Sequence, residues 1–281
     1  MADDLVSNPD TNPAQVPTSV VRYRGAEHER AGDLVAAEEP LEIRLATASG
    51  ERTVALTMRT PGSDAELAAG FLYAERVIAG KDDLVGFTEE GEARENRILV
   101  ELAAGLDPDL APLERHFFTS SACGVCGKAA LDGLIDAGLR PLPRGFTVDR
   151  SVLSALPDRL REAQGVFEVT GGLHAAALFS ADGELLAVRE DVGRHNALDK
   201  LVGWALMEGR LPFADGVVMV SGRSSYEIVQ KVLAAGAPVV CSVSAPSSLA
   251  VELAEAFRVT LVGFLRGERF NVYAAAERVV G

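Results

Sequence analysis

Residues 217–264 read VVMVSGRSSYEIVQKVLAAGAPVVCSVSAPSSLAVELAEAFRVTLVGF, and this stretch decides the fold. Short apolar runs alternate in it with longer runs of helical period. The pattern predicts three strands and two helices, with strands at 217–220, 239–243 and 259–264 and helices at 226–235 and 249–257. Strands that alternate with helices are typical of a partly parallel sheet covered by helices. We therefore expect an α/β fold built around this stretch.

The residues just upstream extend the same domain. Leu173–Phe179 and Glu184–Val188 flank Asp182-Gly183, a dipeptide typical of a hairpin turn. A helix is expected from Asn196 to Met207, where Gly209 stops it. The sheet should therefore contain an antiparallel hairpin beside its parallel part.

The N-terminal portion follows a different pattern. Residues 41–45 and 54–58 alternate apolar and polar side chains, which predicts a β-hairpin. Residues 63–66 have capping-box spacing before an apolar run, and Gly80 offers a stop, so we expect a helix of about four turns between them. Residues 98–102 suit a further strand. This portion is expected to be a small α+β unit.

Four segments follow from these patterns. They are a flexible tail at 1–19, a small α+β domain at 20–113, a Cys-containing loop with its following helix at 114–145, and the larger domain at 146–281.

Composition excludes several classes of protein. The 281 residues are 48% hydrophobic and 24% charged, as in ordinary soluble proteins. No apolar run approaches the roughly 20 residues of a membrane-spanning helix. The first 17 residues lack the basic start and apolar centre of a secretory signal, so a cytoplasmic location is expected. A net charge of −14 argues against general nucleic-acid binding, which needs a basic surface.

The three cysteines are too few for a disulfide framework. Cys123 and Cys126 form a CxxC pair in the string CGVCGK, on a glycine-rich loop before a helix expected at 129–137. The helix dipole and Lys128 would favour the nucleophilic thiolate. From the residues alone, a redox or sulfur-handling pair, half of a zinc site and incidental cysteines all remain open. Cys241 lies in an apolar strand and is expected to be buried.

Three segments share one design, a strand end that leads through small residues to a helix start. They are Glu190–Asn196, Ser221–Ser225 and Ser244–Ser248. Backbone N–H groups and serine hydroxyls at helix N-termini bind phosphate, and such loops gather at the carboxyl ends of the strands in an open α/β sheet. Together they favour a nucleotide-like ligand, although each alone is also typical of a helix cap.

Basic residues concentrate in the same half of this acidic chain. They are Arg194, Arg223, Lys231, Arg266 and Arg269. They suit an anionic ligand or a solvated surface equally well. His195 also has two interpretations, because it could contact a ligand or hold its own loop by hydrogen bonds.

The quoted strings resemble one family, the formate dehydrogenase accessory sulfurtransferases, or FdhD/NarQ family. The matching strings run in one order at Glu39–Ile43, Arg59–Gly62, Glu66–Leu72, Cys123–Lys128, Thr170–His174, Asp191–Asn196, Asp199–Lys200, Ser221–Arg223, Ser244–Ala250 and Gly263–Gly267. They cover roughly residues 39 to 274.

The resemblance implies a sulfurtransferase. Sulfur would be taken as a persulfide from a cysteine desulfurase and passed to the molybdenum bis(guanine dinucleotide) cofactor, which then enters formate dehydrogenase. Cys123 matches the persulfide-bearing cysteine of the family, and Cys126 matches its partner. The cofactor-contacting segment would be Phe264, Leu265, Arg266, Gly267, Glu268 and Arg269. The loop residues that we add to it are Ser221, Gly222, Arg223, Arg194, His195, Ser244 and Ser247.

The resemblance further implies a larger, cytidine-deaminase-like three-layer domain with a mixed sheet, and a homodimer. The H-x-E and P-C-x-x-C pair that holds zinc in such deaminases is absent from the sequence, so neither deamination nor a catalytic metal is expected. Two other functions stay open: a thiol-disulfide oxidoreductase, and a chaperone that binds the cofactor without covalent chemistry.

Overall fold

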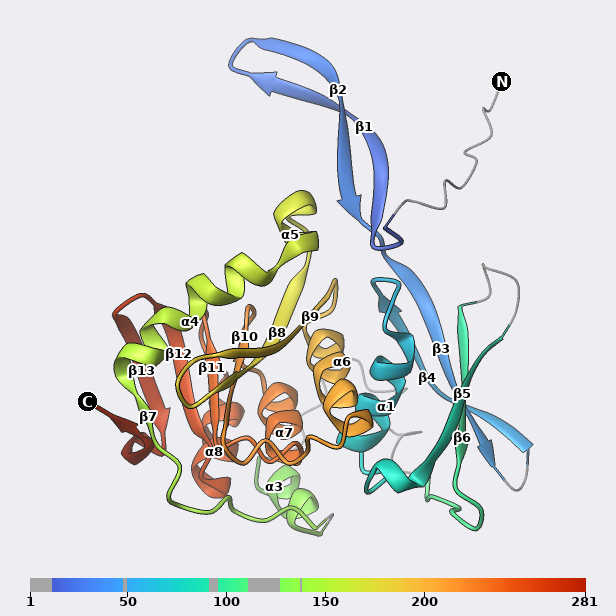
Figure 1. The fold of residues 1–281 in the computed structure, drawn as a ribbon, viewed down its shortest axis with the longest axis vertical. Helices are drawn as coiled ribbons and strands as arrows, with labels where there is room; N and C mark the ends of the chain where they lie inside the picture. The colour runs from blue at the N-terminus through green and yellow to red at the C-terminus, as the bar shows by residue number, and fades with distance from the viewer. Residues whose placement is uncertain (1–11, 48–49, 91–95, 111–126, 137) are drawn as a thin grey trace.

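The computed structural model describes residues 12–47, 50–90, 96–110, 127–136 and 138–281. Its largest sheet has six strands in the order β13-β12-β11-β10-β8-β9 (Figure 1). The strands are β8 (His174–Ser180), β9 (Leu185–Asp191), β10 (Gly216–Val220), β11 (Val239–Ser242), β12 (Thr260–Arg266) and β13 (Arg269–Ala274). β10, β11 and β12 are parallel to one another, while β8 is antiparallel to β9 and β10, and β13 to β12. The expected mixed sheet is confirmed.

Helices cover both faces of this sheet, which gives three layers (Figure 1). The helix on one face is α4 (Arg150–Ala163), and those on the other are α6 (Arg194–Met207), α7 (Tyr226–Ala234) and α8 (Ser248–Phe257). The expected helices at 196–207, 226–235 and 249–257 therefore form within a residue or two of their predicted bounds.

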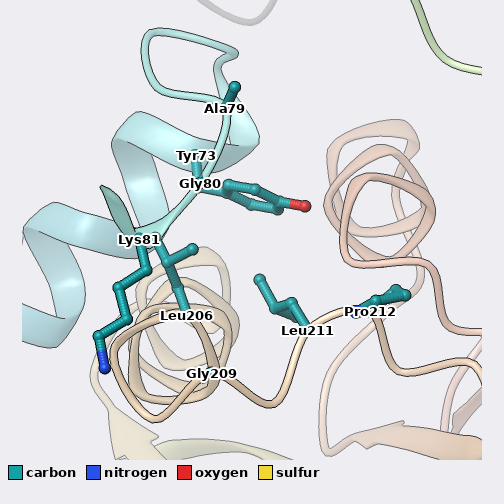
Figure 2. Close-up of a pocket in the computed structure, with 8 residues that line it drawn as sticks. All are labelled: Tyr73, Ala79, Gly80, Lys81, Leu206, Gly209, Leu211 and Pro212. Atoms are coloured by element: carbon teal, nitrogen blue, oxygen red, sulfur yellow. The ribbon is translucent and has the colours of Figure 1, made fainter. Parts of the chain in front are cut away.

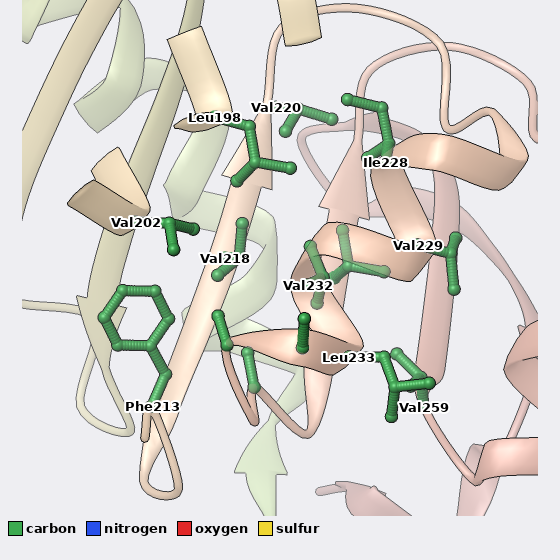
Figure 3. Close-up of a cluster of buried hydrophobic side chains, with 14 of the residues drawn as sticks. Leu198, Val202, Phe213, Val218, Val220, Ile228, Val229, Val232, Leu233 and Val259 are labelled. Carbon is green, nitrogen blue, oxygen red and sulfur yellow. The ribbon is translucent and has the colours of Figure 1, made fainter. Parts of the chain in front are cut away.

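Successive side chains of the central strand β10 point to opposite faces of the large sheet. Val218 and Val220 of β10 pack with side chains of α6 and α7, as Figure 3 shows. Val217 and Met219 of the same strand pack on the α4 side with Cys241, which is fully buried. Burial on both faces explains why these strands are continuously apolar in the sequence.

A second, smaller sheet has the order β4-β3-β6-β5. Its strands are β3 (Glu39–Thr47), β4 (Gly50–Arg59), β5 (Leu84–Glu90) and β6 (Arg97–Leu102). The helix α1 (Asp64–Ala74) packs between this sheet and α6 (Figure 1). The predicted hairpin of residues 41–58 is confirmed as β3 and β4, which pair antiparallel.

Two glycines allow α1 and α6 to touch through their backbones. A Cβ atom added at Gly70 would overlap the Asp199 carbonyl oxygen, and one added at Gly203 would overlap the Glu66 carbonyl oxygen. Neither helix has room there for even a methyl group. The contact therefore fixes how the small sheet is placed on the larger one.

The predicted helix of residues 63–80 is shorter than expected. Ser63 has a left-handed backbone, and its side chain makes no capping hydrogen bond. Arg76 is also left-handed, with φ of 63°, and the Val77 N–H bonds back to the Leu72 carbonyl. This pattern is a Schellman motif, which ends the helix before Gly80 is reached.

An N-terminal hairpin projects from the body of the molecule (Figure 1). Its strands are β1 (Gln15–Arg24) and β2 (Glu27–Ala36), joined at Gly25 with φ of 65°. Residues 15–19, which we expected in the flexible tail, belong to β1, so that expectation was wrong. Pairing with β2 along the whole strand, rather than burial, gives these residues their structure.

The sequence patterns did not predict several further elements. They are α4, α5 (Gly165–Thr170), β5, β13, the short strands β7 (Val148–Asp149) and β14 (Val279–Val280), and the 3₁₀ turns η1 (Lys81–Asp83) and η2 (Ala276–Arg278). Pro157 lies inside α4 and masks its helical pattern, because proline rarely occurs within a helix. The helix expected after the CxxC loop is present as α3 (Gly127–Asp136). Within the described ranges, none of the helices is both long and apolar enough to cross a bilayer.

We expect Gly203→Ala to destabilise the protein, because the new methyl group must push α6 away from α1. Overpacking of this kind costs about 1 to 3 kcal/mol or more in the free energy of unfolding. Gly133→Ala is the matched control, since Gly133 is an exposed helical glycine with open space around it. The control should be neutral or stabilising by up to about 1 kcal/mol. Equal urea midpoints for Gly203→Ala and the wild type would contradict this account.

Candidate functional site

Four strands of the large sheet end at the same edge. β9, β10, β11 and β12 all run in one direction, because β8 is antiparallel to both of its neighbours. The segments that follow them are 192–193, 221–225, 243–247 and the tight turn 267–268. We call this set the loop edge. It contains all three segments that the sequence singled out as phosphate-binding candidates.

Backbone contacts hold two of these segments side by side and join them to β12. Ser224 and Pro246 form a parallel bridge, and the Ser247 N–H donates to the Ser224 carbonyl at 3.0 Å. The Phe264 N–H donates to the Ser244 carbonyl at 3.1 Å. The loops that the sequence could only propose to be neighbours are therefore directly connected.

Gly222 lets the start of α6, which follows β9, come close to the loop after β10. A Cβ atom built on Gly222 would lie 3.2 Å from Cδ of Arg194 and 3.4 Å from Nδ1 of His174. A larger residue at position 222 would crowd both side chains. The glycine thus allows Arg194, at the start of α6, to approach the loop after β10.

Arg194 is the cation best placed to meet an anion here. Its Nε is buried without a hydrogen-bond partner, and no carboxylate among the described residues forms an ion pair with it. A buried guanidinium nitrogen without a partner is costly unless a ligand supplies one. Arg223, also at the loop edge, is exposed.

Two further arginines face each other across the β12–β13 turn. Arg266 and Arg269 are paired in register and are both exposed, with Gly267 and Glu268 between them. Like charges directly opposite on neighbouring strands repel each other. A bound anion would relieve that repulsion more fully than the single carboxylate of the turn.

The segment before this turn divides its side chains between surface and core. Phe264 has φ of 54° and is 43% exposed, because a register shift between Gly263 and Arg266 interrupts the strand pairing. Leu265 is fully buried in the core on the α4 side. Of the six residues in the predicted cofactor-contacting segment, Leu265 therefore has no side chain available at the loop edge.

His195 lies at the loop edge but does not form a catalytic relay. Its Nε2 is 3.2 Å from both the Ser225 hydroxyl and the Glu227 carboxylate. In a Ser-His-acid triad the two partners bind opposite nitrogens of the imidazole, whereas here both approach the same one. Burial lowers the pKa of His195 to about 4, against the opposing effect of Glu227. These contacts favour the interpretation in which a neutral His195 holds its loop.

His174 is a site residue that the loop patterns missed. It begins β8, opposite Asp191 in the β8–β9 hairpin, and its Nδ1 is 3.3 Å from the Ser221 hydroxyl. That hydroxyl also accepts the Ala175 N–H at 2.9 Å. Burial and the nearby Arg194 lower the pKa of His174, so it too is neutral at pH 7. The hairpin register was the signal that could have placed it here.

The serines differ in what they do. Ser247 is the N-cap of α8, and its hydroxyl accepts the Ala250 N–H at 3.3 Å. Ser224 is fully buried, and its hydroxyl has no partner among the residues that the structure describes. Ser244 contributes its carbonyl to the contact with Phe264. Ser247 thus acts as a helix cap, which was one of the two interpretations of these serine-containing segments.

Lys231 is neither at the loop edge nor on a solvated surface, so neither interpretation of the basic residues applies to it. Its Nζ is buried and lies 2.8 Å from Asp199 of α6 and 3.8 Å from Glu75. Burial raises the pKa of Asp199 to about 6, although the attraction of Lys231 opposes the rise. The charge of Lys231 is used inside the protein, between α6 and α7.

Cys123 and Cys126 lie outside the described residues. The chain that follows α3 is described, and its Leu142 N–H donates to the Phe257 carbonyl at 2.9 Å. Phe257 ends α8, whose N-terminus is at the loop edge. Leu142 therefore lies toward the opposite edge of the sheet.

Two other features carry no site assignment. The hollow in Figure 2, of about 280 Å³, lies between the C-terminal ends of α1 and α6, and its Lys81 amine points away from the Tyr73 hydroxyl. Among the described residues, no three His, Cys, Asp or Glu side chains form a group suited to a metal ion.

The fold and the loop edge define a mixed α/β protein whose candidate site lies at the carboxyl ends of its strands. The chain belongs to the FdhD/NarQ family, whose model matches residues 36–280. It is 50% identical over 273 residues to a sulfur carrier protein FdhD of Mycolicibacterium paratuberculosis, covering 92% of this chain and 99% of the relative.

Two more relatives extend this result. A sulfur carrier protein FdhD of Streptomyces coelicolor is 51% identical over 269 residues, covering 92% of this chain and 94% of the relative. The crystal structure of a proposed formate dehydrogenase accessory protein from Desulfotalea psychrophila matches with a TM-score of 0.75 and 26% identity. The match covers 95% of this chain and 100% of that one.

We expect the ring of His195 to titrate near pH 4 by NMR. Glu227→Gln should lower this pKa further, because the carboxylate favours the imidazolium. Since the pKa in the folded state lies below the ordinary value of about 6.5, His195 costs stability as the pH falls from about 6.5 toward 4. A measured pKa at or above 6.5 would contradict the burial described here.

Proposed function

We propose that this protein accepts sulfur as a persulfide on Cys123 from a cysteine desulfurase and delivers it to the molybdenum bis(guanine dinucleotide) cofactor of a formate dehydrogenase. The observation that carries the proposal is 50% identity over 92% of the chain to a protein named as a sulfur carrier. The CGVCGK string supplies the thiols that such a carrier needs.

Sulfur acceptance is a thiol exchange. The Cys123 thiolate attacks the terminal sulfur of the persulfide on the desulfurase, a new S–S bond forms on Cys123, and the cysteine of the donor leaves as a thiolate. The reaction needs no external oxidant, because the sulfur moves with its oxidation state unchanged. Cys126 is close enough in sequence to stabilise the persulfide. Alternatively, its thiolate attacks Sγ of Cys123, so that a disulfide forms and the outer sulfur leaves as hydrosulfide.

The loop edge suits the substrate cofactor. Each guanine dinucleotide has a pyrophosphate. The edge provides Arg194, which has no ion-pair partner in the described part of the chain, and the mutually repelling Arg266 and Arg269. Charge-assisted bonds from arginine to phosphate are among the strongest polar contacts in proteins. An acidic protein can thus bind an anion through a local concentration of positive charge.

Three further expectations remain proposals. They are a homodimer, a cytoplasmic location, and a cytidine-deaminase-like arrangement of the larger domain. The last concerns architecture only, because the sequence lacks the zinc-binding pair of those deaminases.

Cys123→Ala should abolish persulfide formation after incubation with a desulfurase and its cysteine substrate, as read by mass spectrometry. Cys126→Ala should be milder, and Cys241→Ala should retain the persulfide because its thiol is buried. A cofactor chaperone without covalent chemistry would show no persulfide in any variant. A persulfide carried by Cys241, or by none of the three cysteines, would rule out this assignment.

Arg194→Ala, Arg223→Ala and Arg266→Ala should each weaken binding of GDP, which presents the base and pyrophosphate of the cofactor. Loss of one charge-assisted contact costs about 1.5 to 3 kcal/mol, or roughly ten- to a hundredfold in Kd. Arg150→Ala, an exposed arginine at the start of α4, is the control. Calorimetry at low salt measures the affinities, and persulfide formation should survive in all four variants. If the three tested variants bind GDP as tightly as Arg150→Ala does, these arginines do not bind the ligand.

A further inference from the structure

The end of β4, in the small sheet, is bonded to the start of α6, in the large domain. The Asn196 side-chain amide donates to the Met58 carbonyl at 2.8 Å, and its oxygen lies 3.3 Å from the Thr57 hydroxyl. Asn196 is in the first turn of α6, two residues after Arg194 and one after His195. The small sheet therefore reaches the loop edge directly.

Asp191 is the centre of this contact. Its carboxylate is fully buried, and one oxygen accepts the Gly193 N–H at 2.8 Å and the Asn196 amide at 3.1 Å. The other oxygen accepts the Thr60 N–H at 3.1 Å and lies 2.7 Å from Nζ of Lys200. Four donors around one carboxylate leave the segment before Arg194 little freedom to move.

Thr60 uses all of its polar atoms in the same contact. Besides its N–H, its carbonyl accepts Nζ of Lys200 at 2.8 Å, and its hydroxyl accepts the Val192 N–H at 3.1 Å. Thr60 is 3% exposed and is 131 residues from Asp191 in the chain. The bond to Val192 thus links a side chain of the small domain to the segment just before Arg194.

We propose that Thr60 is a positioning residue for the anion site, acting through the Val192 N–H to hold Arg194 at the loop edge. The inference rests on the proposed function, because it assumes that Arg194 binds phosphate there. It adds a role for the small domain, whose Arg59–Gly62 string has no other function assigned. A buried N–H without its acceptor would let the loop shift, and Arg194 would have to be ordered again when the anion binds.

The hydroxyl can be tested apart from the packing of the side chain. Thr60→Val keeps the shape and removes the acceptor, whereas Thr60→Ser keeps the acceptor and removes a buried methyl group. We expect Thr60→Val to raise the Kd for GDP about two- to tenfold, which corresponds to the loss of one hydrogen bond. Thr60→Ser should bind like the wild type, even though its melting temperature falls through the lost methyl group.

Thr53→Val is the matched control, because Thr53 lies in β4, the strand that precedes Thr60, and its hydroxyl donates an exposed hydrogen bond to the Glu42 carboxylate. Its GDP affinity should equal that of the wild type. All affinities are measured by calorimetry at one temperature at which circular dichroism shows every variant to be folded. A purely structural role for Thr60 would lower melting temperatures and leave the Kd values equal.

The outcomes separate this inference from the proposed function. If the wild type binds GDP and Thr60→Val binds it as tightly, the positioning role is wrong while the proposed function stands. If Thr60→Ser loses as much affinity as Thr60→Val, the hydroxyl is not the cause and the role is again wrong. If the folded wild type does not bind GDP, the cofactor-binding part of the proposed function is wrong, and the positioning role with it.

Discussion

The arrangement of the molecule depends on the close crossing of α1 and α6 at Gly70 and Gly203. Because neither residue has a side chain, the helix backbones approach directly, and their relative placement is set by sterics. Ion pairs join each helix to a neighbouring element, because Arg189 of β9 pairs with Glu66 of α1 and Lys231 of α7 pairs with Asp199 of α6. The Lys231–Asp199 pair is buried, and such pairs add little net stability, since desolvation offsets their attraction. The orientation of α1 and α6 is therefore set chiefly by the glycine contact.

That crossing also explains how a small α+β unit takes part in a site at the edge of another sheet. α6 starts at the loop edge and is held by α1 further along its length, so the end of β4 is brought to the first turn of α6. The loops after β10, β11 and β12 would gather in any sheet with parallel central strands. The segment after β9, which leads to Arg194, is additionally bonded to the small domain.

The sequence predicted the large sheet well because its strands are buried on both faces and its helices are amphipathic or apolar. Residues 217–264 contain complete elements with clear boundaries, and strand direction then placed the candidate loops together. The projecting hairpin was missed because most of its side chains are exposed, so its strands lack a buried face to reveal them. The buried role of Lys231 could not be predicted, because its partner, Asp199, is 32 residues away and only tertiary structure brings the two together.

The buried cysteine of the central sheet has a measurable property. Cys241 is fully buried between the strands and α4, and burial raises the pKa of its thiol far above the usual range. A thiol in that position reacts with an alkylating reagent only when β11 is exposed by unfolding. Cys241 is thus an internal probe for opening of the central sheet, and its alkylation rate reports how often the core opens under native conditions.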